Sequence, residues 1–529
     1  MATISAPRAA WSAFRHRGFA VIWTATLVSN IGTWMYGAAA GWLMTRLDPH
    51  PLSVSLVQVA TALPMFMFAL PAGVLADIVD RRRLLIVVEV AIAAVSAAFA
   101  ALVSLGVVTP AILLAFMFVI ATGAAVTAPA WQSIVALLVP KEDLGAAVAS
   151  NSVGVNISRA IGPALGGIVT VGVGLAAPFW IDAFSNLGVI AALVRWHAPE
   201  TKAHRLPAER FASAFRTGVR YARNNRPLRF TLLRAAGFFL FASAYWALLP
   251  LVTRTQLGGS ATLYGILLGS IGVGAVAGAF VLPRLKAMLG ADRLVAAGAI
   301  GTAAALVLYG LARAPSIAIT ASLLAGASWI ATLATLNVSA QLALPEWVRG
   351  RGLATYVTVM FGAMTVGSAL WGEISAVLGL PAAHFLAAAG SLLATVLTSR
   401  YRLQSGTGLD LTPSMHWPAP IVAEDMEQHA GPVMVTVEYH VAPGNRTAFL
   451  DAINSLAAER RRDGAYAWGV FEDLAAPGRY VETFYVETWI EHLRQHERVT
   501  QADRALEERV ERLLLEPSMT THLVAADRR

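Results

Sequence analysis

Three ionisable side chains stand inside long apolar runs of this chain, where an isolated charge is costly. Asp182 and Arg159 lie in neighbouring runs, and Glu89 lies in an earlier one. With a rise of 1.5 Å per residue, Arg159 is about 20 Å from one end of its run, and Asp182 is at about the same depth. Such a group costs several kcal/mol unless it meets a partner or an aqueous cavity. We therefore expect Asp182, Arg159 and Glu89 to carry or control protons.

Two interpretations of these groups stay open. Asp182 and Arg159 pair, or are bridged by a bound molecule, or they form a static pair that only orients two helices. Glu89, about 9 Å inside its run, is a second proton carrier or a side chain that extends to the membrane interface. Three further ionisable groups near the ends of their runs are expected at that interface: Glu373, His384 and Arg234.

Neutral polar and aromatic side chains in the same runs suit a cavity for a bulky, partly aromatic ligand. The alternative is that they are packing or interface residues, which most aromatic residues in membrane helices are. The candidates are Asn30, Thr33, Trp34, Trp131, Gln132, Asn156, Tyr245, Trp246, Asn337 and Gln341.

Long apolar helices are needed to hold these side chains. The 529 residues are 57% apolar and only 14% charged, with a mean hydropathy of +0.60. Twelve runs are long enough to cross about 30 Å of hydrocarbon. They cover roughly 18–43, 53–75, 84–105, 110–138, 145–171, 175–196, 231–253, 262–284, 291–311, 314–341, 351–378 and 381–399.

The short loops between the runs differ in basic charge. One set carries Arg81 to Arg83, Lys141, the segment 195–229, Arg284 to Arg293 and Arg349 to Arg351, whereas the other has only Arg46, Arg254 and Arg313. Because Lys and Arg are concentrated in cytoplasmic loops, we place both termini in the cytoplasm. Residues 401–529 instead hold 13 Lys and Arg against 20 Asp and Glu, which indicates an acidic soluble tail.

A weak internal repeat relates residues 140–167 to residues 345–372 at an offset of 205 residues. Each copy begins in a polar turn and continues into the next apolar run, as the duplicated halves of a membrane transporter do. The first copy has Asn156, Arg159 and Pro163, where the second has Phe361, Met364 and Ser368. The polar chemistry is therefore expected in the N-terminal half.

The loop after the second run reads GVLADIVDRRR, from Gly73 to Arg83. It resembles the signature of the major facilitator superfamily, G-x-L-A-D-R-x-G-R-R/K, with Ile78 in place of the usual Arg and Asp80 in place of the usual Gly. The resemblance implies twelve transmembrane helices in two six-helix halves. It also implies a gating loop containing Gly73, Asp77, Arg81 and Arg82. The alternative is that this loop only anchors the helices at the membrane surface.

The fifth run contains RAIGPALGG, from Arg159 to Gly167. Glycines allow close contact between membrane helices, and a proline allows a bend, so we expect a helix-five hinge at Gly162, Pro163, Gly166 and Gly167. The string is similar to the signature of the proton-driven exporters of the same superfamily, and this implies efflux.

The predicted domains are an N-terminal half at 1–196, a cytoplasmic central loop at 197–230, a C-terminal half at 231–400, a linker at 401–430 and a tail domain at 431–529. The central loop interleaves Arg205, Arg210, Arg216, Arg220 and Arg223 with apolar residues. It is either a basic helix on the inner leaflet or a solvated linker.

The tail predicts a βαββαβ order, with strands at 433–441, 465–472, 479–487 and 518–525 and helices at 443–462 and 490–514. This order is ferredoxin-like. GAYAWGVFED and ETWIEHLRQHERVTQAD resemble the tails of the enterobactin-exporter-like transmembrane secretion effector subgroup and the antibiotic-biosynthesis monooxygenase fold, which implies a homodimer through the tail. His492 and His496 are one helical turn apart, a spacing that can bind metal, and Trp468 and Trp489 could line a pocket. We nevertheless expect a dimerising or regulatory module with neither bound metal nor catalysis.

The chain has no cysteine and no Gly-x4-Gly-Lys-Ser/Thr phosphate loop, so thiol chemistry is excluded and ATP is not expected as a direct energy source. The prediction is a bacterial inner-membrane exporter, without a cofactor, that moves a small amphipathic molecule by alternating access driven by protons. The resemblance implies a siderophore-like or drug-like cargo. Its partners are that substrate, protons and lipid, with no nucleic acid. The rival readings are an importer or uniporter of the same fold, and a membrane-tethered enzyme in the tail.

Overall fold

A computed structural model describes residues 11–196, 220–405, 410–414, 416–417, 427 and 430–526. The side chains of Val74, Ala76, Asp77, Ile78, Lys141 and Glu497 are outside this description. The central loop from 197 to 219, which carries three of the five predicted basic positions, also lies outside it, so its two interpretations stay open.

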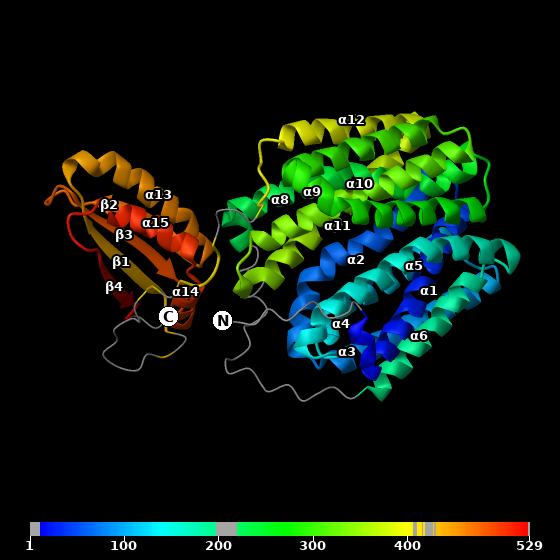
Figure 1. Ribbon diagram of the computed structural model, residues 1–529, viewed down its shortest axis with the longest axis horizontal. Coiled ribbons are helices and arrows are strands. Elements are labelled where there is room, and N and C mark those ends of the chain that lie inside the picture. The colour runs from blue at the N-terminus through cyan, green and yellow to red at the C-terminus, as the bar shows by residue number, and fades with distance from the viewer. Residues whose placement is uncertain are drawn as a thin grey trace. The chain divides into compact units, whose positions relative to one another are not determined.

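Long helices form most of the described chain between Arg17 and Thr398 (Figure 1). They are α1 (Arg17–Leu47), α2 (Pro51–Ile78), α3 (Arg81–Ser104), α4 (Pro110–Val135), α5 (Leu144–Gly172), α6 (Ala177–Arg195), α8 (Arg226–Leu251), α9 (Ala261–Leu311), α10 (Pro315–Leu342), α11 (Arg349–Leu378) and α12 (Leu380–Thr398). Short turns of other helix types are Ser12–Arg15, Lys141–Asp143, Val252–Gln256, Glu346–Val348 and, in the tail, Pro443–Asn445.

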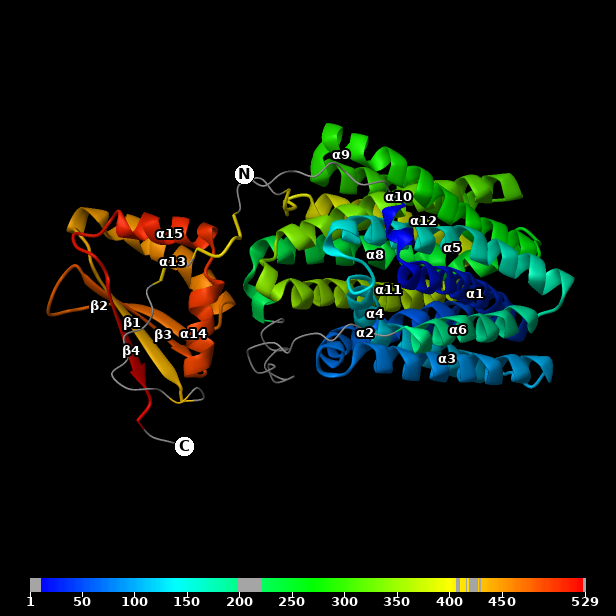
Figure 2. The same cartoon turned by 60° about the horizontal axis from the view of Figure 1, so that its bottom comes forward.

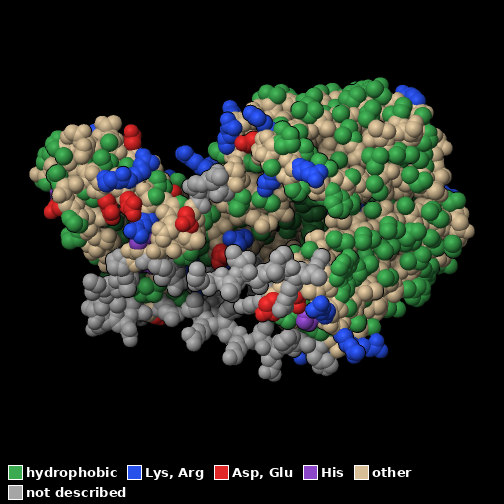
Figure 3. Space-filling view, viewed as in Figure 1, with side chains coloured by type: hydrophobic (Ala, Val, Ile, Leu, Met, Phe, Trp, Pro, Cys, Tyr) green, Lys and Arg blue, Asp and Glu red, His purple; other side chains and the backbone are tan. Residues whose placement is uncertain are grey.

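Nine helices of the described residues are long and apolar enough to cross a membrane. Helix α9 has 51 residues and is bent at Gly290, whose φ of 72° lies outside the helical region. At 1.5 Å per residue it is more than twice as long as the hydrocarbon layer is thick, so it corresponds to two of the predicted runs. Helices α1 and α5, of 31 and 29 residues, correspond to two more. Apolar side chains dominate the flank of the bundle (Figure 3).

Glycines let helix α5 pack closely against two other helices. A methyl group on Gly166 would be 2.9 Å from the Met35 Cα of α1, and one on Gly167 would overlap the Ala261 carbonyl oxygen at the start of α9. From the α9 side, Gly265 would overlap the Pro163 carbonyl oxygen in the same way. The two halves are therefore in backbone contact along α5 and α9.

The second copy of the sequence repeat makes the corresponding contact, from the C-terminal half to the N-terminal half. A methyl group on Gly372 of α11 would overlap Ser55 and lie 3.2 Å from the Leu52 Cα, at the start of α2. Gly167 and Gly372 are equivalent in the sequence repeat, and each packs against the first turns of a helix in the opposite half. The weak repeat therefore corresponds to a structural duplication.

The tail is an antiparallel sheet with helices on one face (Figures 1 and 2). Its strands are β1 (Val433–His440), β2 (Tyr466–Glu472), β3 (Arg479–Val486) and β4 (Met519–Val524), in the order β2-β3-β1-β4. Helices α13 (Arg446–Arg462), α14 (Trp489–Arg498) and α15 (Gln501–Glu511) complete it. Alternate residues of β1 and β3, such as Val435 and Phe484, are buried in the core. The predicted ferredoxin-like order is confirmed.

The single predicted helix over 490–514 is wrong, because it is two helices. Thr500 caps α15: its hydroxyl accepts from the Asp503 N–H, and the Asp503 carboxylate accepts from the Thr500 N–H. This reciprocal capping box starts a new helix and was readable from the T-x-x-D spacing.

The chain divides into two compact units whose limits differ from the predicted domains. One contains most of the long helices. The other contains the tail together with residues 212–231 and 339–355. Within this second unit, the Arg498 guanidinium lies 4.4 Å from the Trp347 ring centre, and an Arg220 nitrogen lies 3.7 Å from a Glu491 oxygen.

Candidate functional site

Asp182 lies in the second turn of α6 and is almost fully buried, with 2% of its surface exposed. Ser96 Oγ of α3 donates to one carboxylate oxygen at 2.7 Å, and Thr33 Oγ1 of α1 donates to the other at 3.1 Å. Gly32 makes this arrangement possible, since a methyl group there would be 3.1 Å from the Asp182 Cα. Two neutral hydroxyls, rather than a cation, therefore hold this carboxylate.

Glu89 is the second buried acid of the same half, two helical turns from Ser96 along α3. Trp131 Nε1 of α4 donates to its carboxylate at 3.3 Å. Helix α3 thus carries both Glu89 and Ser96, a hydrogen-bond donor to Asp182 of α6.

Arg159 does not form the direct ion pair with Asp182 that we considered. Its guanidinium lies 5.5 Å from the ring centre of Trp34 on α1. No ion pair of Arg159 occurs among the residues that the structure describes. Thr33 and Ser96 instead each donate a hydrogen bond to an Asp182 oxygen. Bridging by a bound molecule stays a prediction.

The other predicted cavity residues fall into two groups. Tyr245 and Trp246 join Trp329 of α10 in an aromatic cluster, with ring centres 5.6 Å apart for Trp246 and Trp329. Asn156 donates to the Ser152 carbonyl on its own helix. Asn30, Trp34 and Trp131 are half-buried, while the surfaces of Thr33, Gln132, Asn337 and Gln341 are exposed. Contact of these residues with a substrate stays a prediction.

Sequence reasoning missed several polar residues that complete the site. Ser96 binds Asp182, and Ser29 Oγ of α1 donates to Asn186 Oδ1 of α6 at 2.6 Å. Serine and glycine are common in membrane helices, so nothing in their own segments distinguished them. The spacing of Ser29, Gly32 and Thr33 on one face of α1 was a usable signal.

Comparison with known proteins supports the same fold and class. The sequence profile described as "Transmembrane secretion effector" matches residues 8–529. The chain belongs to this family of the major facilitator superfamily. A staphyloferrin A transporter of Staphylococcus aureus is 24% identical over 274 residues, which are 49% of this chain and 65% of that protein, slightly less than two thirds of its length. The multidrug efflux pump Tap of Mycobacterium tuberculosis is 25% identical over 413 residues, which are 75% of this chain and 96% of Tap.

Solved transporter structures share the fold of this chain. A POT family transporter in complex with a thioalcohol-conjugated peptide gives a TM-score of 0.58 at 13% identity, covering 72% of this chain and 95% of that one. A bacterial homologue of the human lysosomal transporter Spinster, inward-facing and occupied, gives 0.57 at 13% identity, covering 74% and 97%. At these identities the likeness is one of fold alone.

The signature loop between α2 and α3 has a structural role at Asp80 and Arg82. Asp80 Oδ1 accepts from the Arg83 N–H at 2.7 Å and caps the start of α3. Arg82 donates to the carbonyls of Leu193 and Val194 at 2.8 and 2.6 Å, at the C-terminal end of α6. Asp80, which departs from the usual Gly, is therefore a helix cap. Gly73 has no neighbour within 4 Å of an added methyl group, and the predicted gating side chain of Asp77 is outside the described residues.

The predicted helix-five hinge lies in a continuous helix. Helix α5 runs through Pro163 from Leu144 to Gly172. A methyl group on Gly162 would be 2.9 Å from the Ile31 carbonyl oxygen of α1, and Gly166 and Gly167 make the close contacts given above. The glycines thus serve helix packing; a hinge motion stays a prediction.

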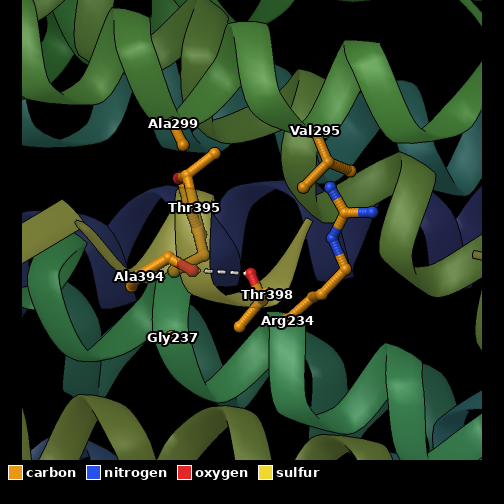
Figure 4. Close-up of a pocket in the computed structure, with 8 residues that line it drawn as sticks. Arg234, Gly237, Val295, Ala299, Ala394, Thr395 and Thr398 are labelled. Carbon is orange, nitrogen blue, oxygen red and sulfur yellow. Dashed lines mark hydrogen bonds between the residues drawn. The ribbon is translucent and has the colours of Figure 1, made fainter. Parts of the chain in front are cut away.

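Arg234, which was predicted at the membrane interface, is instead buried, with 4% of its surface exposed. It forms an ion pair with Asp292 of α9, and Arg234 also donates to the Asp292 carbonyl at 3.2 Å. Its side chain borders a small crevice, where Thr398 donates to the Ala394 carbonyl (Figure 4). The crevice is also lined by Gly237, Phe238, Val295, Ala299 and Thr395. The expectation failed because it did not include a partner for Arg234. His384 is also fully buried rather than interfacial, bonding the Leu380 carbonyl.

A buried charge cluster in the tail gives a testable pH dependence. Burial, and then the neighbouring Asp503 carboxylate, raises the pKa of Glu459 to about 9 from 4.5. Between those values the folded tail holds a proton that the unfolded tail releases, so the free energy of unfolding falls as the pH rises. Glu459→Gln should remove this loss. Each pH unit between the two pKa values changes the free energy of unfolding by about 1.4 kcal/mol, so the variant should raise that of the tail by several kcal/mol at pH 8 and by about 1 kcal/mol or less at pH 5.

Hydrogen exchange of β1 and α13 amides in the full chain measures this change. The matched control is Glu508→Gln, because Glu508 is half-exposed and pairs with Arg504 on the surface of α15. An equal effect of Glu459→Gln at both pH values would contradict a protonated Glu459.

Proposed function

We propose that this protein is a proton-coupled exporter of a small amphipathic molecule that works by alternating access in the bacterial inner membrane, with both termini in the cytoplasm. The observation that carries the proposal is Asp182, a buried carboxyl inside the helix bundle held by the hydroxyls of Thr33 and Ser96. Hydroxyls can bind either the charged or the neutral form of a carboxyl, because each can donate or accept. Such a group can take up and release a proton without losing its ligands.

Glu89 is the second proton site of the proposal. Both acids are buried in the same half, so a charge on one disfavours a charge on the other. Protonation of Glu89 therefore favours release of the proton from Asp182. The two acids form a short route along α3, with Trp131 orienting Glu89.

Arg159 is proposed to contact the substrate. A cation that is stacked on an aromatic ring and has no carboxylate partner among the described residues is suited to an anionic group beside an aromatic or apolar one. The printed names of the relatives, a staphyloferrin A transporter and a multidrug efflux pump, support a siderophore-like or drug-like cargo.

Replacement of Arg159 tests the charge preference. Arg159→Gln should lower the affinity for anionic substrates at least tenfold, equal to about 1.4 kcal/mol, because it removes the positive charge of the guanidinium. Cationic dyes should be bound as well as before. The affinity is measured by competition in detergent-solubilised protein across a panel of siderophores and dyes. Equal losses for anionic and cationic ligands would mean that Arg159 supports the fold instead.

Transport itself is tested in inverted membrane vesicles with and without an imposed pH gradient. An exporter should accumulate its substrate inside these vesicles when their interior is acidic, and accumulation should stop when the gradient is collapsed. Uptake that does not respond to the gradient would favour a uniporter. Accumulation only in right-side-out vesicles would favour an importer.

The tail is proposed to regulate transport and to form a homodimer. Regulation is supported by contacts of α14 within its own compact unit, where Glu491 faces Arg220 and Arg498 faces Trp347. Dimerisation is supported by three apolar side chains, aligned across the sheet face opposite the buried one: Met434, Tyr485 and Leu523. Leu523→Glu should make the solubilised protein monomeric in light scattering if this face is the interface.

A further inference from the structure

Three histidine side chains of the tail lie together between helix α14 and strand β4. His492, His496 and His522 each place a ring nitrogen within 4.8 Å of the others. The sequence indicated the first two by their spacing, but His522 comes from a strand that is 26 residues farther along the chain than His496. Three imidazoles from two elements form a possible ligand set, which was not expected.

Backbone geometry directs all three rings to one place. His492 and His496 are four residues apart on α14, so they lie on one side of the helix. His522 is aligned with Val435, whose side chain is in the buried core, and so it faces the helices rather than the open side of the sheet. The ring centres of His492 and His522 are 4.7 Å apart.

Hydrogen bonds define which nitrogen of His492 carries the proton. Gln495 Nε2 donates to the Asp463 carbonyl at 3.2 Å, which fixes the orientation of this amide. Gln495 Oε1 is therefore an acceptor, and His492 Nδ1 must donate to it across 3.2 Å. In the neutral ring the other nitrogen, Nε2, then presents its lone pair toward His496. A ligand nitrogen held by a hydrogen bond on the far side of its ring is the usual arrangement in metal sites.

The spacing of the two nitrogens fits an ion between them. His492 Nε2 and His496 Nε2 are 3.3 Å apart. Two nitrogens bound to tetrahedral zinc at about 2.0–2.1 Å stand about 3.3–3.4 Å from each other. The same separation is long for a direct hydrogen bond between two rings. His522 needs to approach by only about 1–1.5 Å to complete the set.

We propose that His492, His496 and His522 bind one divalent transition-metal ion of the Zn²⁺ class, with a fourth position open to water or another ligand. Ligation by imidazole alone favours zinc, copper or nickel over magnesium or calcium, which take oxygen ligands. The aromatic rings of Trp489 and Trp417, with centres 5.5 and 5.1 Å from those of His492 and His496, limit access of water.

The electrostatics of the cluster agree with this assignment. Burial, followed by the neighbouring His496 and His522, lowers the pKa of His492 to about 3, and burial also lowers the pKa of His522. Neutral imidazole is the form that binds metal. This proposal does not depend on the transport mechanism, because the site lies in the tail.

The test measures metal binding by the full chain, solubilised in detergent and purified without a polyhistidine tag. Zn²⁺ is titrated against a chromogenic chelator, and Co²⁺ binding is followed by its visible d–d bands. We expect one equivalent of Zn²⁺ per chain and the intense Co²⁺ spectrum of a four-coordinate site. His496→Gln and His522→Gln should each weaken Zn²⁺ binding at least about 100-fold, since even outer-shell changes cost about 10- to 100-fold.

The matched control is His440→Gln, a half-exposed histidine of β1 that pairs with Glu516. This variant should bind Zn²⁺ as the parent chain does. Failure to bind stoichiometric Zn²⁺ would overturn the proposal, and so would unchanged affinity in His522→Gln. An equal loss in His440→Gln would show non-specific binding and also overturn it. Preserved hydrogen-exchange protection of β1 in the metal-free variants distinguishes a lost ligand from a misfolded tail.

Discussion

Asp182→Asn should abolish transport driven by a pH gradient while leaving substrate exchange intact. Asparagine has nearly the same shape as aspartate, and its side-chain oxygen can still accept from Ser96 or Thr33. It cannot carry a proton. If one proton crosses per cycle, each pH unit supplies about 1.4 kcal/mol, so the variant should lose about tenfold accumulation per unit of gradient. The measurements are gradient-driven accumulation in inverted vesicles and counterflow between two pools of substrate.

Two further variants separate this role from a general loss of structure. Glu373→Gln is the matched control, because Glu373 is an exposed carboxyl on α11, and it should keep both activities. Glu89→Gln should slow gradient-driven transport if Glu89 delivers the proton. Coupled transport in Asp182→Asn would refute the assignment of Asp182. Loss of counterflow together with accumulation would show that Asp182 maintains the helix packing.

Much of the architecture was predictable because it depends on local signals. Apolar runs of sufficient length predicted the long helices, and alternating residues such as Val433, Val435 and Val437 predicted the tail strands. The division of the last charged helix was missed, although Thr500 and Asp503 form a standard capping pair. The number of membrane crossings still rests on helix length, with α9 supplying two.

The candidate site was less predictable because its ligands come from separate helices. Asp182 stood out as a charge in an apolar run, but nothing in the sequence linked it to Ser96 of α3 rather than to Arg159. Charge complementarity favoured the ion pair, yet the structure satisfies the carboxylate with hydroxyls. A similar long-range pairing joins Arg234 to Asp292. Tertiary contacts of this kind leave no periodic pattern in either segment.

The sequence repeat had a more specific consequence than its score suggested. Its two copies conserve the glycine that contacts the opposite half, at Gly167 and Gly372. Both contacts are made with the first turns of a helix, α9 in one case and α2 in the other. The orientation predicted from the distribution of basic loops places those turns at the outer end of the bundle. Under the proposed alternating access, these two symmetric contacts are places where the halves close against each other.

Gly167→Ala should therefore shift the protein away from the conformation described here. The added methyl group would overlap the Ala261 carbonyl oxygen, a backbone atom that cannot turn aside. Overpacking of this kind costs about 1–3 kcal/mol, which corresponds to roughly a 5- to 150-fold change in the equilibrium between two conformations. The outer end should open more often. Because the chain lacks cysteine, Thr33→Cys provides a single labelling site at an exposed position of α1.

The measurement is the rate at which a membrane-impermeant maleimide labels Thr33→Cys from the periplasmic side. Gly172→Ala is the matched control, since it lies on the same helix with no atom within 4 Å of the new methyl group, and its rate should equal that of the parent. Gly372→Ala should accelerate labelling as Gly167→Ala does, because the duplication assigns both glycines the same task. Acceleration by only one of them would mean that the halves do not open symmetrically. Unchanged labelling rates in both would refute the proposal that the Gly167 and Gly372 contacts close the outer end.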